Sequence, residues 1–281
     1  MTLPSTRSWT AFRAEPRRRR VGQQPSALLL LGVTLLAAAC AGGNRDEGAA
    51  TQAPAPTTGP AIAKPCLRGV KSAEVVRFGT SAGAALVGVV LGSGRTGLVL
   101  GHQLGSDLCE WLPQAQAFAE QGYRVLAFDF QGFGDSQPGS GTDAGIDTDV
   151  VAAAEQLRRR GADQIVLIGS SMGGTAVLSA ATRIRPPVAG VVSLSGPASF
   201  QDVDAGAAIS RLRVPALFVA GADDHPFVDD ARTMYRAAPT SDKRLLVIPG
   251  GGHGTSMLEF GDDAPKVLGA LRKLIADHTS R

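Results

Sequence analysis

The sequence predicts an α/β protein built on one mostly parallel central sheet with helices on both faces. Short apolar runs rich in β-branched residues alternate with longer, helix-like segments over most of the chain. Continuous apolar runs of this length are typical of strands buried on both faces, as in parallel sheets. The 281 residues, of which 44% are hydrophobic, suffice for one sizeable domain with appendages. In this architecture ligands bind at the carboxyl ends of the strands.

The first 64 residues are expected to lie outside this domain. Residues 17–20 are four arginines, and they precede an apolar run at 27–39. That run has the length of a signal-peptide core and is too short to span a bilayer comfortably. We therefore predict a signal peptide at residues 1–39, a flexible tether at 40–64 rich in Gly, Ala, Pro and Thr, and one domain at 65–281.

The predicted signal peptide ends in small residues directly before Cys40, in the sequence LLAAAC. This resembles the lipobox of bacterial lipoproteins, in which the cysteine is lipidated and becomes the new N-terminus. The resemblance implies a lipid anchor at Cys40 and a place on the outer face of the bacterial cell membrane. Ordinary secretory cleavage after Ala39, which would give a secreted protein, and an uncleaved anchor are the alternatives.

Charge argues against a nucleic-acid partner. The full chain has a net charge of +3, but residues 1–39 hold six arginines and one glutamate. Without them 22 basic and 24 acidic side chains remain, a net charge of −2. The basic character therefore belongs to the predicted signal peptide, and no basic patch for nucleic acid is expected in the domain.

The cysteines predict one disulfide. If lipid occupies Cys40, then Cys66 and Cys109 are the two cysteines left in the chain. In an exported protein two such cysteines favour a disulfide, and two buried free thiols are the alternative.

The domain is expected to begin with a β-hairpin, residues 73–80 and 85–92, because turn residues lie between these two runs. Further strands are predicted at residues 97–101, 123–130, 165–168, 188–194, 216–220 and 244–248. Helices are predicted at residues 109–121, 147–160, 175–183, 229–237 and 264–277, the second of them ending at Gly161. The chain shows no internal repeat and no second domain.

Residues 164–174, QIVLIGSSMGG, carry the strongest chemical signal. The motif G-x-S-x-G lies between a predicted strand and a predicted helix, which is the context of a nucleophile elbow. A serine on so sharp a turn needs neighbours without Cβ, and Gly169 and Gly173 meet that need. The turn would expose the Ser171 hydroxyl and direct the backbone N–H of Met172 toward an oxyanion. An incidental serine in a glycine-rich connection is the alternative.

HQLGSD with Trp111, DFQGFGDS at residues 129–136 and the elbow follow one another along the chain. GADD at 221–224 and GHG at 252–254 come after them. Over residues 68–278 this series resembles the α/β-hydrolases, in which an H-G-x-G loop, a D-x-R-G-x-G-x-S turn, the nucleophile elbow, an acid turn and a histidine turn occur in the same order. We interpret Asp129, Gly132, Gly134 and Ser136 as structural residues of a tight turn beside the site.

The resemblance implies a catalytic triad in the order serine, acid, histidine. Ser171, Asp224 and His253 meet that order, with Asp223 as the alternative acid. His102 precedes the nucleophile and is expected instead to shape the loop that follows the third strand.

The second oxyanion donor is expected in that loop. The family pattern assigns it to the N–H of Leu104, which would act together with Met172. Gln103 replaces the usual glycine, so the N–H of Gln103 is a second candidate.

The sequence thus predicts an extracytoplasmic serine hydrolase that cleaves a small ester, in the manner of a carboxylesterase, through an acyl-enzyme. Only about twenty residues, 197–217, separate two strands between which many relatives insert a cap, so we expect a minimal lid. This resembles the small dienelactone-hydrolase-like members, whose nucleophile is a cysteine.

The sequence also allows three other functions: a peptidase or a thioesterase of the same fold, and a non-catalytic lipoprotein that binds an envelope partner. No metal and no organic cofactor is expected, since the sequence has neither a ligand-spaced cluster nor a dinucleotide fingerprint.

Overall fold

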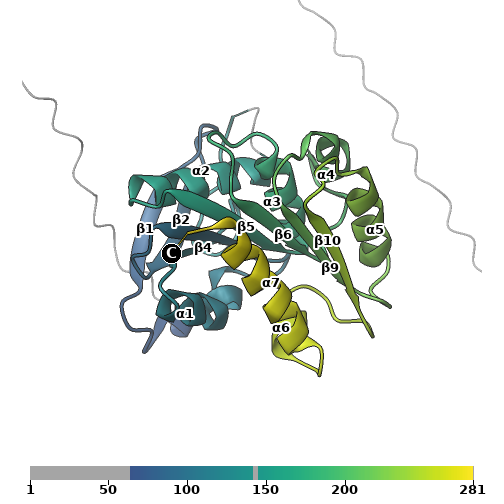
Figure 1. Cartoon of the computed structure of the whole chain (residues 1–281). Coiled ribbons are helices and arrows are strands. Elements are labelled where there is room, and N and C mark those ends of the chain that lie inside the picture. Colours follow the sequence, from purple (N-terminus) through teal and green to yellow (C-terminus); the bar gives the residue numbers. More distant parts are fainter. Residues whose placement is uncertain (1–63, 142–144, 281) are drawn as a thin grey trace, which may run out of the picture. The chain divides into compact units, whose positions relative to one another are not determined.

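The computed structural model describes residues 64–141 and 145–280 (Figure 1). The predicted signal peptide, Cys40 and all of the predicted tether except Lys64 lie outside these residues. In the described part of the chain no helix is both long and apolar enough to cross a membrane.

One eight-stranded sheet carries the fold, in the order β1-β2-β4-β3-β5-β6-β9-β10. Its strands are β1 (Glu74–Gly79), β2 (Ala85–Leu91), β3 (Thr96–Gly101), β4 (Arg124–Asp129), β5 (Gln164–Ser170), β6 (Gly190–Leu194), β9 (Ala216–Gly221) and β10 (Lys243–Ile248). β1 and β2 form the predicted antiparallel hairpin, and β2 pairs antiparallel with β4. From β4 to β10 every pairing is parallel, so the carboxyl ends of β3, β5, β6, β9 and β10 share one edge.

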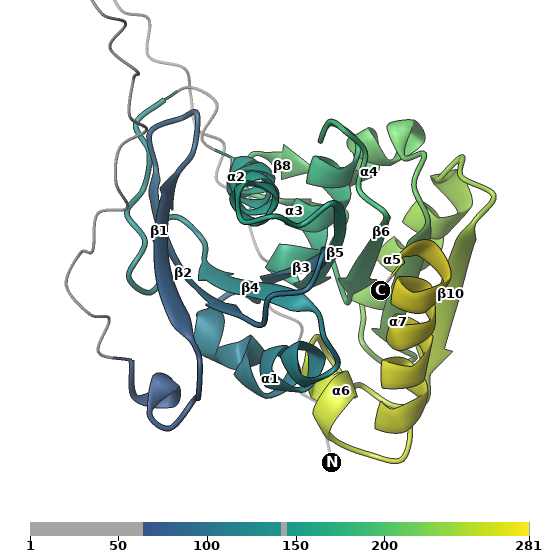
Figure 2. The same cartoon turned by 60° about the vertical axis from the view of Figure 1, so that its left-hand side comes forward.

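Helices cover both faces of this sheet, as predicted (Figure 2). The helices are α1 (Leu112–Glu120), α2 (Ile146–Arg159), α3 (Met172–Ala181), α4 (Ala205–Ala208), α5 (Phe227–Ala237), α6 (Ser256–Glu259) and α7 (Ala264–His278). Three short 3₁₀ helices, η1 (Pro65–Leu67), η2 (Leu108–Trp111) and η3 (Ile209–Arg211), complete the set. The predicted helix at 109–121 therefore begins as η2 and continues as α1.

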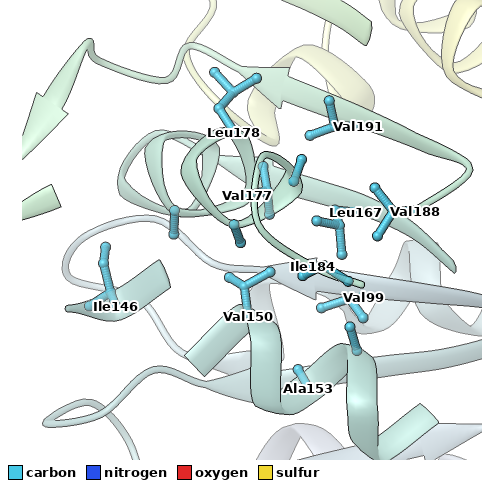
Figure 3. Close-up of a cluster of buried hydrophobic side chains, with 14 of the residues drawn as sticks. Val99, Ile146, Val150, Ala153, Leu167, Val177, Leu178, Ile184, Val188 and Val191 are labelled. Carbon is cyan, nitrogen blue, oxygen red and sulfur yellow. The ribbon is translucent and has the colours of Figure 1, made fainter. Parts of the chain in front are cut away.

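Two buried apolar clusters hold the helices to the sheet, one on each face. The first joins α2, α3 and α5 to side chains that alternate along the strands. Figure 3 shows part of it, with Val150 of α2 and Val177 of α3 near Leu167 of β5. The second packs α1 and α7 against the opposite face, with Trp111 and Leu271 fully buried. Burial on both faces explains why the central strands β6 and β9 are almost entirely apolar.

The segment between β6 and β9 is short, as predicted, but it is not a plain loop. It holds a two-stranded hairpin, β7 (Ser199–Phe200) and β8 (Val203–Asp204), followed by α4 and η3. The Asp204 carboxylate caps α4 by accepting the N–H of Ala207 at 2.7 Å. Strands of two residues lie below the length at which periodicity is visible in a sequence.

A disulfide joins Cys66 of η1 to Cys109 of η2, across 43 residues of sequence, and confirms that prediction. Close to it, Lys64 Nζ lies 2.8 Å from Asp107 Oδ2 and 3.0 Å from Asp129 Oδ2. Lys64, assigned to the tether by composition, is therefore fixed to the domain by ion pairs. Burial opposes its charge, but hydrogen bonds to these two carboxylates raise its pKa above 10.5.

Candidate active site

Ser171 occupies the turn between β5 and α3, with φ 49° and ψ −116°. A non-glycine residue at positive φ is strained, and such strain is concentrated at functional sites. The Ser171 N–H donates to Leu194 O at 2.8 Å, which fixes the turn to the end of β6. A Cβ on Gly169 would collide with the carbonyl oxygen of Gly173, so the predicted crowding of the turn is present.

Asp224 and His253 meet at the same edge of the sheet. Asp224 follows β9, and its Oδ2 lies 2.8 Å from His253 Nδ1, with Oδ1 at 3.1 Å. The Asp224 side chain is 10% exposed and the His253 side chain 31%. Asp223, the alternative acid, is exposed, and its backbone N–H donates to Gly250 O. The geometry thus favours Asp224 as the partner of His253.

The elbow and the histidine loop, residues 249–255, are in contact. Ser170, which directly precedes Ser171, accepts the N–H of Thr255 on its hydroxyl at 3.2 Å. Among the described residues the structure shows no hydrogen bond between Ser171 Oγ and His253 Nε2. Hydrogen bonds of this kind tighten in the complex with substrate. The three predicted residues therefore lie on one edge, with Asp224 and His253 joined directly.

Phe227, the first residue of α5, covers one side of His253. The two ring centroids are 4.4 Å apart, and the ring planes are inclined at 62°. This edge-to-face contact favours one orientation of the imidazole and adds an apolar wall to the site.

The loop after β3 is braced by His102. Its Nδ1 lies 2.8 Å from Gln103 O, and its Nε2 accepts the N–H of Phe130 at 3.1 Å. These partners assign the hydrogen to Nδ1. Burial lowers the pKa of His102 below 6.5, which keeps the ring neutral. The prediction that His102 shapes this loop agrees with the contacts.

The two candidates for the second oxyanion donor differ in their contacts. The N–H of Gln103 donates to Glu110 Oε2 at 2.9 Å, so it is already engaged. In the described part of the chain no hydrogen bond uses the N–H of Leu104 or of Met172. Those two N–H groups are therefore the ones that remain able to bind an oxyanion. The Leu104 side chain is 57% exposed, beside the site.

Hydrogen bonds hold the DFQGFGDS turn, both within residues 129–136 and to neighbouring segments. The fully buried Asp129 carboxylate accepts the N–H groups of Leu108 and Asp135, each at 2.8 Å. The Ser136 hydroxyl donates to Asp129 O and accepts the N–H of Val87. The turn therefore ties together β2, β4 and the start of η2, in line with its interpretation as structural.

Several residues in and around the site carried no signal in the sequence. Glu110 and Ser170 are examples, because their roles depend on contacts between segments far apart in the chain. For Ser170, only its place inside the elbow motif could have suggested a role. Within the described residues no group of three His, Cys, Asp or Glu side chains could hold a metal ion.

Comparison with known proteins points to one fold. Residues 96–205 match the model of the family described as alpha/beta hydrolase fold. The uncharacterized protein Rv2307c of Mycobacterium tuberculosis is 28% identical over 207 residues, which cover 66% of this chain and 71% of that protein.

Solved structures agree with this match. The esterase Pf2001 of Pyrococcus furiosus superposes with a TM-score of 0.63 at 17% identity, over 73% of this chain and 92% of that chain. A thermophilic esterase from Thermogutta terrifontis gives a TM-score of 0.59 at 21% identity, over 73% and 100% of the two chains. The strand order, the two helical layers and these likenesses together show that the chain has the α/β-hydrolase fold.

Proposed function

We propose that the protein is a serine hydrolase that cleaves a small carboxylic ester through an acyl-enzyme. The observation that carries this proposal is the pairing of Asp224 with His253 at 2.8 Å, at the sheet edge where Ser171 occupies a strained turn. A serine hydroxyl is a weak nucleophile until a base removes its proton, and the base needs a carboxylate to orient it. Those requirements match the three residues.

In the proposed reaction Ser171 Oγ attacks the ester carbonyl carbon and His253 Nε2 takes the hydroxyl proton. Asp224 accepts the hydrogen on Nδ1 and stabilises the imidazolium that forms. The N–H groups of Met172 and Leu104 stabilise the oxyanion. His253 then returns the proton to the leaving alcohol, and the acyl group stays on Ser171. Water, activated by His253, attacks the acyl-enzyme and releases the acid and the free serine.

The short segment between β6 and β9 supports a small substrate. Only the β7–β8 hairpin, α4 and η3 occupy the place between these strands, and α4 has four residues. A lid of this size offers little apolar surface for a long acyl chain. The two similar solved structures described above are esterases, which favours an ester over a peptide bond at the level of analogy.

We also propose that the protein is exported and attached to the outer face of the cell membrane by lipid at Cys40. The lipobox-like sequence before Cys40 supports this, and so does the Cys66–Cys109 disulfide, because disulfides persist in oxidising compartments. Full-length protein with Cys40→Ser should move from the membrane fraction to the soluble fraction. Retention of that variant in the membrane would contradict the lipid anchor.

Labelling with a fluorophosphonate tests the proposed chemistry. The full-length protein should gain the mass of one adduct, and Ser171→Ala should gain none. Ser193→Ala is the matched control, because Ser193 is a buried serine of β6 and should leave labelling unchanged. An unlabelled wild-type protein, or an adduct that persists in Ser171→Ala, would contradict an activated serine at the elbow.

A substrate panel then separates the bond types. Acetyl and butyryl esters should be cleaved faster than long-chain esters, thioesters and peptide amides of matched acyl groups. Faster cleavage of the thioesters or amides would replace the esterase proposal by a thioesterase or a peptidase of the same fold.

A further inference from the structure

Serine hydroxyls accept hydrogen bonds from the backbone of the histidine loop. It contains Pro249, three consecutive glycines, His253, Gly254 and Thr255. A Cβ on Gly250 or Gly251 would meet nothing within 4 Å, so the Cα atoms of these two glycines face open space. Glycine-rich backbone is conformationally permissive, and a fixed position for His253 must come from elsewhere.

Three consecutive backbone N–H groups, those of residues 253, 254 and 255, each meet a serine hydroxyl. The His253 N–H donates to Ser256 Oγ at 3.1 Å, the Gly254 N–H to Ser195 Oγ at 3.2 Å, and the Thr255 N–H to Ser170 Oγ at 3.2 Å. Ser170 and Ser195 are fully buried at the carboxyl ends of β5 and β6. The loop is thereby attached to two central strands of the sheet.

Ser195 has φ 51°, a left-handed conformation that favours glycine or asparagine over serine. Its N–H donates to Val219 O at 2.8 Å, so the backbone is fixed in place. Such strain is concentrated at functional sites, and the Ser195 hydroxyl accepts the N–H of the residue next to His253, which indicates a functional role for this hydroxyl.

Gln103 extends these contacts to the loop after β3. The Ser170 hydroxyl donates to Gln103 Oε1 at 3.2 Å, and the Gln103 N–H donates to Glu110 Oε2 at 2.9 Å. Gly254 packs so closely here that an added Cβ would lie 2.5 Å from Gln103 Oε1. The hydrogen bonds therefore run without a break from the histidine loop through Ser170 and Gln103 to Glu110.

We propose that Ser170, Ser195 and Gln103 are positioning residues. They hold the histidine loop in a fixed position beside the elbow and couple it to the loop that carries Leu104. The inference rests on the proposed hydrolase function and adds to it. It gives Gln103, a departure from the family's glycine, a role of its own: an acceptor that the Ser170 hydroxyl requires.

Hydrogen exchange and labelling kinetics on full-length variants test this inference. Ser195→Gly removes the hydroxyl, which destabilises, and relieves the positive φ, which stabilises, so its melting temperature should change little. Amide exchange at residue 254 should rise about 10-fold or more, since that N–H loses its buried acceptor. The rate of fluorophosphonate labelling should fall about 10-fold. Ser170→Ala should raise amide exchange at residue 255 and lower the labelling rate in the same way. Ser193→Ala, two residues before Ser195 in the chain, should change neither the exchange nor the labelling rate.

Two further variants separate positioning from general stability. Ser195→Gly should lower the labelling rate by a much smaller factor in an Asp224→Asn background than in the wild type, because both changes act through His253. If Ser195→Gly acted only on general stability, it would lower the labelling rate by the same factor in both backgrounds. Gln103→Gly, which restores the family's residue, should lower the labelling rate, and a rise would overturn the role given to Gln103.

The outcomes are distinguishable from failure of the proposed function. Unchanged exchange at residues 254 and 255 would overturn the inference whatever the activity, and so would faster exchange with an unchanged labelling rate. A wild-type protein that takes no label would refute the hydrolase proposal, and the exchange rates would still decide whether these serines hold the loop.

Discussion

The Oδ2 atom of Asp224 lies 2.8 Å from Nδ1 of His253, whereas the side chain of its neighbour Asp223 is exposed. The two aspartates follow the same strand, and the chain could have presented either to the histidine. The backbone decides between them: the Asp223 N–H is tied to Gly250 O and the Asp224 N–H to Gly221 O. This tight turn at the end of β9 leaves the Asp224 carboxylate facing His253.

Asparagine substitutions at these two positions should therefore differ sharply. Asp224→Asn should lower kcat/KM for a short-chain ester about 10³–10⁴-fold, because the amide cannot stabilise the imidazolium or hold the required tautomer. Asp223→Asn is the matched control and should stay within about threefold of the wild type. Equal losses in the two variants would mean that the acid is misassigned.

Ionisation of Asp149 should make the free energy of unfolding depend on pH. This side chain of α2 is fully buried, and its carboxylate accepts the backbone and side-chain N–H groups of Gln131. Burial, with a smaller effect from the nearby charge of Asp147, raises its pKa from 3.8 to about 7. Between these two values the folded protein binds a proton that the unfolded chain does not. The free energy of unfolding should therefore fall as the pH rises from 4 to 7.

Asp149→Asn isolates this contribution. The variant should gain stability relative to the wild type between pH 5 and pH 8, by on the order of 2–4 kcal/mol, as measured by urea unfolding at both pH values. His102 acts in the opposite direction, since burial lowers its pKa and its contribution is lost as the pH falls below 6.5. The wild-type curve mixes the two effects, so the difference between variant and wild type is the quantity to compare. An unchanged difference would show that Asp149 is ionised throughout this range.

Replacing His102 should disturb the loop after β3 without removing a triad member. His102→Phe keeps a ring of similar size beside Phe130 and Phe133, but it deprives Gln103 O and the Phe130 N–H of their partner. Each buried group left unpaired costs roughly 1–3 kcal/mol of stability. We expect a lower melting temperature and a kcat reduced more than KM is raised. A loss confined to KM would show that the ring serves substrate binding instead.

The sequence and the structure agree best where the signal is local. The elbow is predictable because Gly169, Ser171 and Gly173 lie within five residues, and their crowding follows from backbone sterics alone. Ser171, Asp224 and His253 each follow a strand that contains an apolar run, so the order of these strands along the chain also predicts which edge the three residues share.

Contacts between distant segments are what the sequence could not supply. Glu110 binds the N–H of Gln103, and Lys64 binds Asp129, through pairings that no local pattern encodes. Strand β6 begins at Gly190 rather than at residue 188, soon after Pro186 and Pro187, which lack the N–H that a ladder needs. The choice between Gln103 and Leu104 as the second oxyanion donor likewise depends on such a contact, because the Gln103 N–H already donates to Glu110.

The disulfide should stabilise the domain by joining η1 to η2. Cys66 and Cys109 close a loop of 43 residues, and Cys109 belongs to η2, directly after the loop that carries Leu104. Chain-entropy arguments assign such a crosslink about 2–4 kcal/mol. The double variant Cys66→Ser/Cys109→Ser should therefore melt several degrees below the wild type. Reductant should lower the melting temperature of the wild type and leave that of the double variant unchanged.

The same pair of variants tests whether the crosslink reaches the site. Ion pairs of Lys64 with Asp107 and Asp129 lie beside the disulfide and hold the same segment, residues 64–66, to the domain. Because these contacts persist without the bond, labelling of Ser171 well below the melting temperature should change less than about threefold. Lys64→Met added to the double variant should then lower the labelling rate further, since the segment before η2 loses its second restraint. Equal melting temperatures with and without reductant in the wild type would show that the bond contributes nothing to stability.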